Sequence, residues 1–210
     1  MSVQSSAATT PATAAHERTE EPLRPLTVTD WLLAVACGFI LGGLMAVAAQ
    51  NSAPESMTLP LAVTGFGLGL LAYLDHVTHL ILNTHNLIFA VAVCAALILP
   101  HQAGYSTWGP AATGAVLVFL FLLALAMLTG FAGGGDIKLA PIPAAALAVA
   151  SPLAACMWLL LTFLVCLIYQ IVCKLKVSPQ KYAAMAPFMA VALVPALVAS
   201  NAIMTATGLQ

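Results

Sequence analysis

Two carboxylates, Asp75 and Asp136, are the side chains of this sequence best suited to chemistry. The chain of 210 residues contains seven acidic residues, and five of them lie at or before position 55. From residue 56 onward, Asp75 and Asp136 are the only acids. A carboxylate at the end of an apolar membrane segment is costly unless it is solvated or used. Acid chemistry in the apolar body of the chain must therefore use these two residues.

Two carboxylates that lie close together do not both ionise readily, so one keeps its proton while the other stays charged. The ionised member can activate a water molecule, and the protonated member can protonate a departing group. Hydrolysis of a peptide bond by this route needs neither a metal nor a covalent intermediate. The pair therefore predicts catalytic roles for Asp75 and Asp136 without a cofactor.

The glycines Gly133, Gly134 and Gly135 directly precede Asp136, and Lys138 follows it. Glycines allow another chain to approach the backbone, so this stretch has room for an extended substrate strand. Lys138 is expected either to bias the pair toward ionisation or to meet lipid phosphates. The simpler interpretation is that each Asp is the polar end of a membrane helix. The glycines that precede Asp136 and the scarcity of other acids after residue 56 favour a catalytic site over this simpler interpretation.

Composition places the chain in a lipid bilayer. The sequence is 62% hydrophobic and 6% charged, whereas soluble domains carry about 25% charged residues. No basic patch that could bind nucleic acid is present. The five cysteines form no C-x-x-C pair, and cysteines inside apolar runs are usually small apolar side chains. We therefore expect no metal and no nucleic-acid partner.

Three histidines lie near Asp75, namely His76, His79 and His85. The spacing of His76 and His79 places both on one helical face, which a metal ion could use. No further ligand is evident beyond Asp75 itself. We interpret the histidines as interfacial residues that tune the carboxylates or contact lipid headgroups.

The apolar runs predict an all-α polytopic membrane protein with about seven transmembrane segments. The segment Ala140–Ala150 is the weakest of the seven because it is only marginally long. The predicted segments are Trp31–Ala49, Leu59–Leu74, Leu87–Leu99, Ala111–Leu128, Ala140–Ala150, Leu153–Cys173 and Tyr182–Ile203.

The basic residues predict the orientation, because Lys and Arg accumulate on the cytoplasmic side. With a cytoplasmic N-terminus and seven crossings, all six basic residues fall inside: Arg18, Arg24, Lys138, Lys174, Lys176 and Lys181. Asp75 and Asp136 are separated by two predicted crossings, so both lie at the cytoplasmic edge of the membrane.

The chain divides into three predicted parts. Residues 1–30 are rich in Ser, Ala, Thr and Pro and are expected to form a disordered cytoplasmic tail. Residues 31–58 form an extra N-terminal span and outer loop, and residues 59–205 form the main membrane domain. Ala46–Ala49 resembles a signal-peptidase site, but the long acidic leader favours a span that is retained.

The stretch Gly133–Leu139 resembles the G-x-G-D-[VI]-K-L motif of type IV prepilin peptidases, a branch of the GxGD membrane aspartic proteases. Asp75, followed by Asn83, is similar to the other aspartate segment of that family. Pro187 lies in a segment, Ala186–Ala190, that resembles the family's P-F-x-A sequence opening the last span. These motifs occur in the family's order, over roughly residues 59–200.

The resemblance implies that Asp75 and Asp136 form the catalytic pair of a GxGD-type core. It implies an endopeptidase of the bacterial inner membrane, with its active site at the cytoplasmic face. The implied partner is a prepilin-like protein of a type IV pilus, Flp or protein-secretion system, cut between its basic leader and its apolar helix. Gly133, Gly134, Gly135, Lys138, Asn83 and Pro187 would bind substrate or shape the site.

The sequence departs from the family pattern in two ways. Leu82 replaces the proline before Asn83, and the basic residues usual in that segment are absent. Larger family members carry a cytoplasmic domain with paired C-x-x-C motifs and also methylate the new N-terminus. This sequence has no such domain, so the resemblance implies a short form without methyltransferase activity.

Other functional interpretations stay open at the level of sequence. Asp75 and Asp136 could couple protons or cations in a small transporter, because acids inside membranes often do so. The chain could also be a catalytically silent subunit of a secretion machinery. A protease of the signal-peptide-peptidase kind is a further alternative, although such chains are usually longer.

Overall fold

The computed structural model describes residues 25–129, 133–175 and 184–208. These residues form helices and short connections, with no strand among them. In chain order the first elements are α1 (Val28–Ser52), η1 (Glu55–Met57), α2 (Thr58–Thr78), α3 (Asn83–Ala96) and α4 (Ile98–Gln102). The later helices are α5 (Trp108–Thr129), α6 (Gly134–Leu139), α7 (Pro141–Ala150), α8 (Pro152–Leu175) and α9 (Ala186–Thr207).

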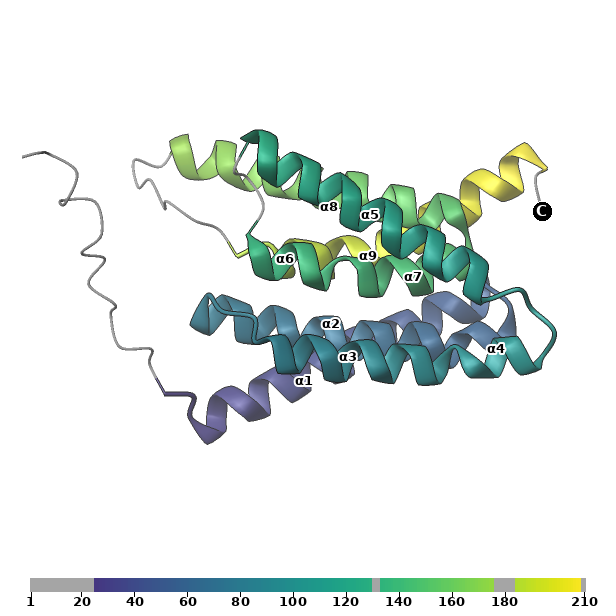
Figure 1. Ribbon diagram of the computed structural model, residues 1–210, viewed down its shortest axis with the longest axis horizontal. Helices are drawn as coiled ribbons and strands as arrows, with labels where there is room; N and C mark the ends of the chain where they lie inside the picture. Colours follow the sequence, from purple (N-terminus) through teal and green to yellow (C-terminus); the bar gives the residue numbers. More distant parts are fainter. Residues whose placement is uncertain (1–24, 130–132, 176–183, 209–210) are drawn as a thin grey trace, which may run out of the picture.

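The helices run roughly parallel or antiparallel in three layers (Figure 1). The helices α1 to α4 form one layer, α6, α7 and α9 form the middle layer, and α5 and α8 form the third. Successive long helices alternate in direction, so α2 ends, α6 begins and α9 begins at the same end of the bundle. This end, which we call the carboxylate end, carries Asp75 and Asp136.

Within the described residues, six helical segments are long and apolar enough to cross a membrane, which suggests an all-α multi-pass membrane protein. The predicted seventh segment, Ala140–Ala150, corresponds to α7, a helix of ten residues. Ten residues span about 15 Å, roughly half the apolar thickness of a bilayer. However, α6 and α7 together lead from the end where α5 stops to the end where α8 starts (Figure 1). The chain therefore traverses the bundle here in two short helices.

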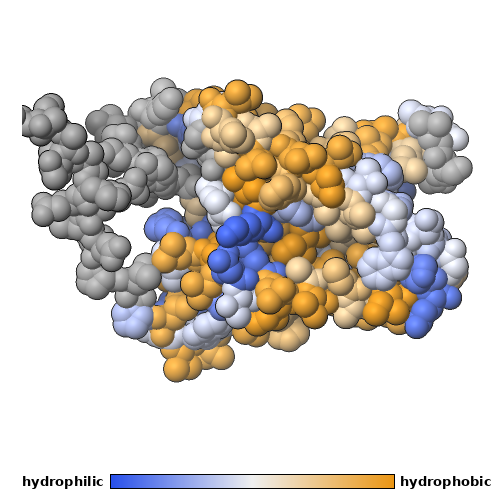
Figure 2. Space-filling view, viewed as in Figure 1, coloured by the Kyte–Doolittle hydropathy of each residue, from blue (hydrophilic) through white to orange (hydrophobic). Residues whose placement is uncertain are grey.

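The surface of the bundle is apolar, as expected for helices that face lipid. Large apolar side chains such as Leu87, Leu117 and Leu160 are more than half exposed. Figure 2 shows that apolar residues cover most of the visible face. Water would penalise such a surface, whereas the hydrocarbon of a bilayer does not.

The first helix begins earlier than predicted, because a capping box fixes its start. The Thr27 hydroxyl accepts a hydrogen bond from the Asp30 N–H at 3.2 Å, and the Asp30 carboxylate accepts one from the Thr27 N–H at 2.8 Å. This reciprocal pair satisfies donors at the helix end. Residues 28–30 therefore belong to α1 rather than to the predicted tail, whose residues 1–24 lie outside the described residues.

Four glycines hold α1 against α2. A Cβ added at Gly38 would lie 2.9 Å from the Phe66 carbonyl oxygen, and one at Gly69 would lie 2.7 Å from the Cys37 carbonyl oxygen. Gly42 and Gly65 are equally close to the facing backbone. Small residues let membrane helices approach in this way. The extra N-terminal span is thus an integral part of the packing.

The signal-peptidase-like sequence Ala46–Ala49 lies within the continuous helix α1, where Ala48 and Ala49 are buried against the bundle. A peptidase cuts an accessible segment, so this packing favours retention of the first span.

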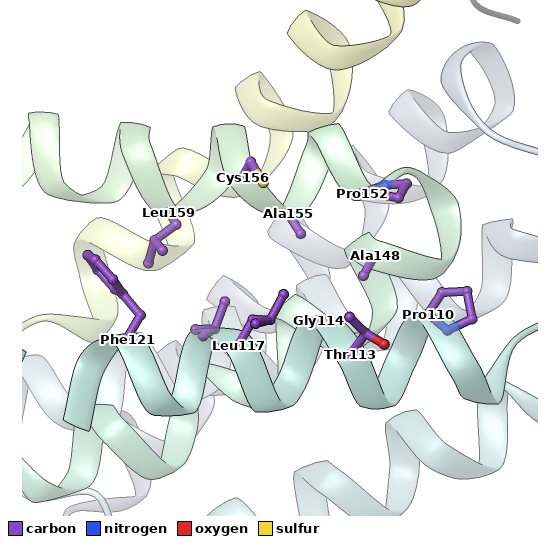
Figure 3. Close-up of a pocket in the computed structure, with 11 residues that line it drawn as sticks. Pro110, Thr113, Gly114, Leu117, Phe121, Ala148, Pro152, Ala155, Cys156 and Leu159 are labelled. Carbon is purple, nitrogen blue, oxygen red and sulfur yellow. The ribbon is translucent and has the colours of Figure 1, made fainter. Parts of the chain in front are cut away.

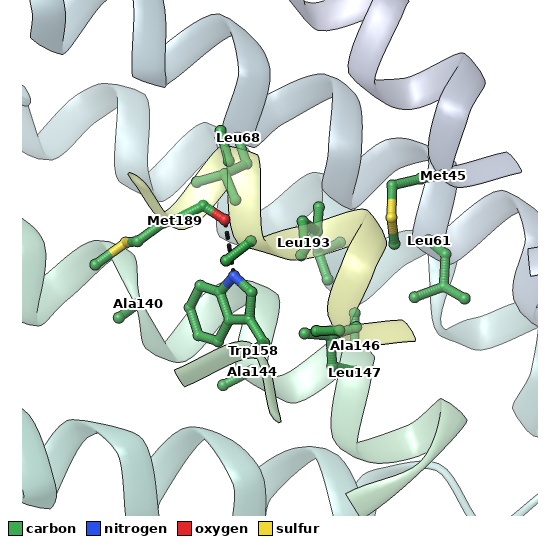
Figure 4. Close-up of a cluster of buried hydrophobic side chains, with 14 of the residues drawn as sticks. Met45, Leu61, Leu68, Ala140, Ala144, Ala146, Leu147, Trp158, Met189 and Leu193 are labelled. Atoms are coloured by element: carbon green, nitrogen blue, oxygen red, sulfur yellow. Dashed lines mark hydrogen bonds between the residues drawn. The ribbon is translucent and has the colours of Figure 1, made fainter. Parts of the chain in front are cut away.

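A buried tryptophan fixes the position of α9. Trp158 of α8 is fully buried, and its indole N–H donates to the Met189 carbonyl oxygen at 2.9 Å. Figure 4 shows its ring among the small side chains Ala140 and Ala144 and beside Leu193. A buried indole needs such a partner. The bond ties α8 to the first turns of α9, next to the carboxylate end.

The glycine contacts predict how α1 responds to a larger side chain. Gly69→Leu should lower the stability of the folded protein by about 1–3 kcal/mol, because the side chain would force α1 and α2 apart. Gly43→Leu is the matched control, because a Cβ at Gly43 meets no atom within 4 Å. Thermal unfolding in detergent measures both. Equal unfolding midpoints for the two variants would contradict the close glycine contacts between α1 and α2.

Candidate active site

The end of α2 places Asp75 inside the bundle. Asp75 lies in the last turn of α2 and is 5% exposed. The helix stops at Thr78 because His79 adopts a left-handed conformation, with φ 52° and ψ 25°. The His79 N–H still donates to the Asp75 carbonyl oxygen at 2.8 Å. Left-handed backbone is uncommon for a residue with a side chain. It turns the chain sharply toward α3.

The N-terminus of α9 faces the Asp75 carboxylate. The Ala186 N–H donates to Asp75 Oδ2 at 3.3 Å, and this bond is buried. Pro187, which follows, has no N–H to offer, and the Phe188 N–H donates to the Met185 carbonyl oxygen at 3.0 Å. Ala186 is therefore the first-turn donor directed at the carboxylate. The positive end of the helix dipole favours a negative charge in this position.

The first turn of α6 positions Asp136. Gly133 is the N-cap residue, and its backbone forms a hydrogen bond with the Asp136 carboxylate three residues later. Acidic residues are favourable at this position of a helix. A Cβ at Gly133 would lie 3.0 Å from Asp136 Oδ2. Glycine at position 133 therefore leaves the space that the carboxylate occupies.

The Asp136 carboxyl group is half-buried, and its protonation is perturbed. Burial is the main cause that raises the pKa of Asp136, the nearby Asp75 adds to the rise, and the Gly133 backbone hydrogen bond opposes it. The net pKa is about 7. The influence of Asp75 means that the structure brings the two carboxyl groups within electrostatic range. A carboxyl group with a pKa near neutrality can hold or release a proton under physiological conditions.

The start of α3 lies against α6. Lys138 Nζ donates to Asn83 Oδ1 at 3.0 Å, and both side chains are exposed. A Cβ at Gly135 would lie 3.4 Å from Ile81 Cβ, which is ordinary contact. Figure 2 shows a hydrophilic patch between α6 and α3, surrounded by apolar surface. The Lys138–Asn83 bond links the two aspartate-bearing segments of the sequence.

The three histidines have different surroundings. His76 and His79 are exposed and lie close enough to Asp75 to interact with its charge. His85 packs edge-on against Trp31 of α1, with 6.0 Å between ring centres. Within the described residues, no three His, Cys, Asp or Glu side chains gather as they would around a metal ion.

Two of the apolar cavities on the bundle surface differ in their distance from the carboxylate end. One, of about 580 Å³, separates α5 from α8, and Figure 3 shows Leu117 and Phe121 facing Ala155 and Leu159 across it. The other, of about 460 Å³, lies between α1, α2 and α9. His76 and Pro187 line the second cavity. The second cavity therefore reaches the last turns of α2 and the first turn of α9, whereas the first lies between α5 and α8.

Most of the predicted site residues gather at the carboxylate end. Asp75, Asp136, Gly133, Asn83 and Lys138 are linked through the contacts described above, and Pro187 adjoins Ala186. Gly134 is exposed, and a Cβ there would meet no atom within 4 Å.

Sequence reasoning missed two groups at this end of the bundle. One is the Ala186 N–H, a backbone group that carries no signal of its own in a sequence. The other is the buried side chain of Asn86. A signal for Asn86 was available, because it precedes Phe89, Val93 and Ala96 at helical spacing and so shares their apolar face.

In comparisons with known proteins, no protein-family model, curated protein or solved structure matches the chain. The chemistry of the site is therefore argued from its own residues and their geometry.

The raised pKa of Asp136 predicts a pH dependence of stability. The ordinary pKa of 3.8 applies to the unfolded chain and about 7 to the folded protein. The folded state thus holds a proton that the unfolded state releases, and this contribution is present below about pH 4 and lost as the pH rises through about 7.

Asp136→Asn should remove this contribution. The melting temperature of the wild type should therefore fall relative to that of Asp136→Asn between pH of about 4 and about 7. Glu55→Gln is the control, because Glu55 is exposed and lies just before the start of α2, whereas Asp75 lies in its last turn. Its removal should leave the dependence of the melting temperature on pH unchanged. Parallel pH profiles for wild type and Asp136→Asn would contradict the assignment.

Proposed function

We propose that this chain is a membrane aspartic endopeptidase that removes the basic leader of prepilin-like proteins. The observation that carries the proposal is the convergence of three segments that are distant in the sequence. The end of α2 brings Asp75, the start of α6 brings Asp136, and the start of α9 brings the Ala186 N–H. These are the segments whose motifs resemble those of type IV prepilin peptidases.

The two carboxyl groups have surroundings that suit different roles. Asp136, with a pKa of about 7, holds the proton and acts as the general acid. Asp75 accepts the Ala186 N–H at the positive end of α9 and acts as the general base. Pairs of acids whose environments differ in this way commonly divide the roles of acid and base.

The reaction balances with these two residues and one water molecule. Asp75 takes a proton from water as the water oxygen attacks the scissile carbonyl carbon, and Asp136 gives its proton to the carbonyl oxygen. The resulting diol collapses as the C–N bond breaks. The proton on Asp75 passes to the departing nitrogen, and a diol hydroxyl returns a proton to Asp136. Both residues regain their starting states.

The nature of the surface supports an apolar substrate with a basic leader. The apolar cavity of about 460 Å³ between α1, α2 and α9, lined in part by His76 and Pro187, offers a surface for an apolar helix. The basic residues of the sequence favour a cytoplasmic location for the carboxylate end. The site therefore cuts at the cytoplasmic face of the inner membrane and releases a helix that remains in the bilayer.

Replacing either carboxylate tests the proposal. Asp75→Asn and Asp136→Asn should each abolish cleavage of a purified prepilin-like substrate, because each removes one partner of the acid–base pair. Glu55→Gln should cleave at the wild-type rate. Gel separation of precursor and product measures all four proteins, with unfolding midpoints as the check on folding. Cleavage by both Asn variants at the wild-type rate would refute the pair.

The glycine stretch offers a second test within the same assay. Gly133→Ala should lower kcat by about tenfold or more, because its Cβ would displace the Asp136 carboxylate from its position. Gly134→Ala should leave kcat unchanged, because a Cβ there meets open space. An increase in KM for Gly134→Ala would support the predicted room for a substrate strand. Equal kcat values for the two variants would argue against the positioning role of Gly133.

A further inference from the structure

Asn86 is a buried amide without a hydrogen-bond partner. Its side chain is 6% exposed, and neither Nδ2 nor Oδ1 has a hydrogen-bond partner among the residues that the structure describes. Two other buried polar side chains, Thr64 and Thr162, are satisfied, because each donates to a backbone carbonyl oxygen four residues earlier. The hydroxyls of Ser56, Thr58 and Thr107 also lack partners among the described residues, but they lie near the starts of α2 and α5, away from the end of α2 that carries Asp75.

An unsatisfied amide of this kind costs the protein stability. Burial removes its hydrogen bonds to water, and no group in the described part of the chain replaces them. An apolar side chain of similar size, such as leucine, would avoid this cost. A buried polar group that does not serve the fold is a candidate for binding something that the free protein lacks.

Asn86 lies one helical turn along α3 from the contact between α3 and α6. Asn83, in the first turn of α3, accepts the hydrogen bond from Lys138 of α6. Asn86 follows three residues later, about 4.5 Å further into the membrane along the helix axis. It belongs to the buried face of α3, together with Phe89 and Val93. That face packs against α2, α6 and α7, and α2 and α6 carry the two carboxyl groups.

We propose that the Asn86 carboxamide binds the backbone of the substrate next to the scissile bond. A carboxamide can donate from Nδ2 to a peptide carbonyl and accept at Oδ1 from a peptide N–H. A membrane helix must unwind before a protease can reach its carbonyl carbons. The freed backbone groups then need new partners, because little water is present at this depth. Asn86 supplies one donor and one acceptor where the helix opens.

This inference rests on the proposed peptidase function, and it makes Asn86 a residue that touches substrate. It also explains why the free protein tolerates the cost of the amide. In the free protein the amide is unpaired, and in the complex the substrate backbone pairs it. Asn86 would therefore recognise an unwound peptide backbone, and its binding would not depend on the side chains next to the cleaved bond.

The first experiment compares Asn86→Leu with Asn51→Leu. Asn51 is an exposed amide that donates to the Val47 carbonyl oxygen at 3.0 Å, so it serves as the matched control. Asn86→Leu should melt no lower than the wild type, yet cleave a prepilin-like peptide at least about tenfold less efficiently in kcat/KM. Asn51→Leu should retain wild-type cleavage. A large drop in the melting temperature of Asn86→Leu would identify a structural amide and overturn the proposal.

The second experiment locates the partner of Asn86. In a series of synthetic substrates, a backbone ester replaces one amide at a time around the cut, which removes a single N–H donor. In the wild type, one ester should reduce cleavage by about tenfold, and the same ester should cause no further loss in Asn86→Leu. Losses that multiply at every position would show that Asn86 does not contact the backbone.

The experiments distinguish an error in the proposed peptidase function from an error in the proposed role of Asn86. If the wild type cleaves and Asn86→Leu cleaves equally well, the inference alone fails. If the folded wild type cleaves no substrate, the proposed function fails. The binding of a fluorescent prepilin-like peptide to wild type and Asn86→Leu then decides the inference. Equal affinities would overturn it, and weaker binding by the variant would support it.

Discussion

The hydrogen bond from the Ala186 N–H to the Asp75 carboxylate joins parts of the chain that are 111 residues apart. It exists because α9 begins next to the last turn of α2. That position depends in turn on the bond of Trp158 to Met189 and on the glycine contacts that hold α1 against α2. The buried carboxylate needs a donor in a medium without water, so the packing of distant helices determines whether the site exists.

Much of the architecture follows from the sequence, because apolar run length reports directly on membrane helices. The six long helices correspond to predicted segments, with ends that differ by a few residues. The differences have local causes. The Thr27–Asp30 capping box starts α1 early. The short helix α7 begins at Pro141, where the missing N–H of proline suits a helix start. The sequence alone showed neither where α6 ends nor how it continues.

The site was less predictable, because sequence motifs indicate residue types rather than contacts. Three consecutive glycines looked equivalent in the sequence, yet their surroundings differ. Gly133 faces the Asp136 carboxylate, Gly134 faces open space and Gly135 touches Ile81. Lys138, which was expected to bias the pair toward ionisation or to meet lipid phosphates, donates a hydrogen bond to Asn83. Such details depend on how α3 and α6 meet, which no local pattern encodes.

The site combines one satisfied polar group with others that are not fully satisfied. Asp75 has its donor in Ala186, Asp136 holds a proton near neutral pH, and Asn86 has no partner. A structural polar network would gain stability by completing its hydrogen bonds. A site that must receive a peptide gains binding free energy by leaving donors and acceptors for it. The proposed binding of a substrate backbone rests on this incomplete network.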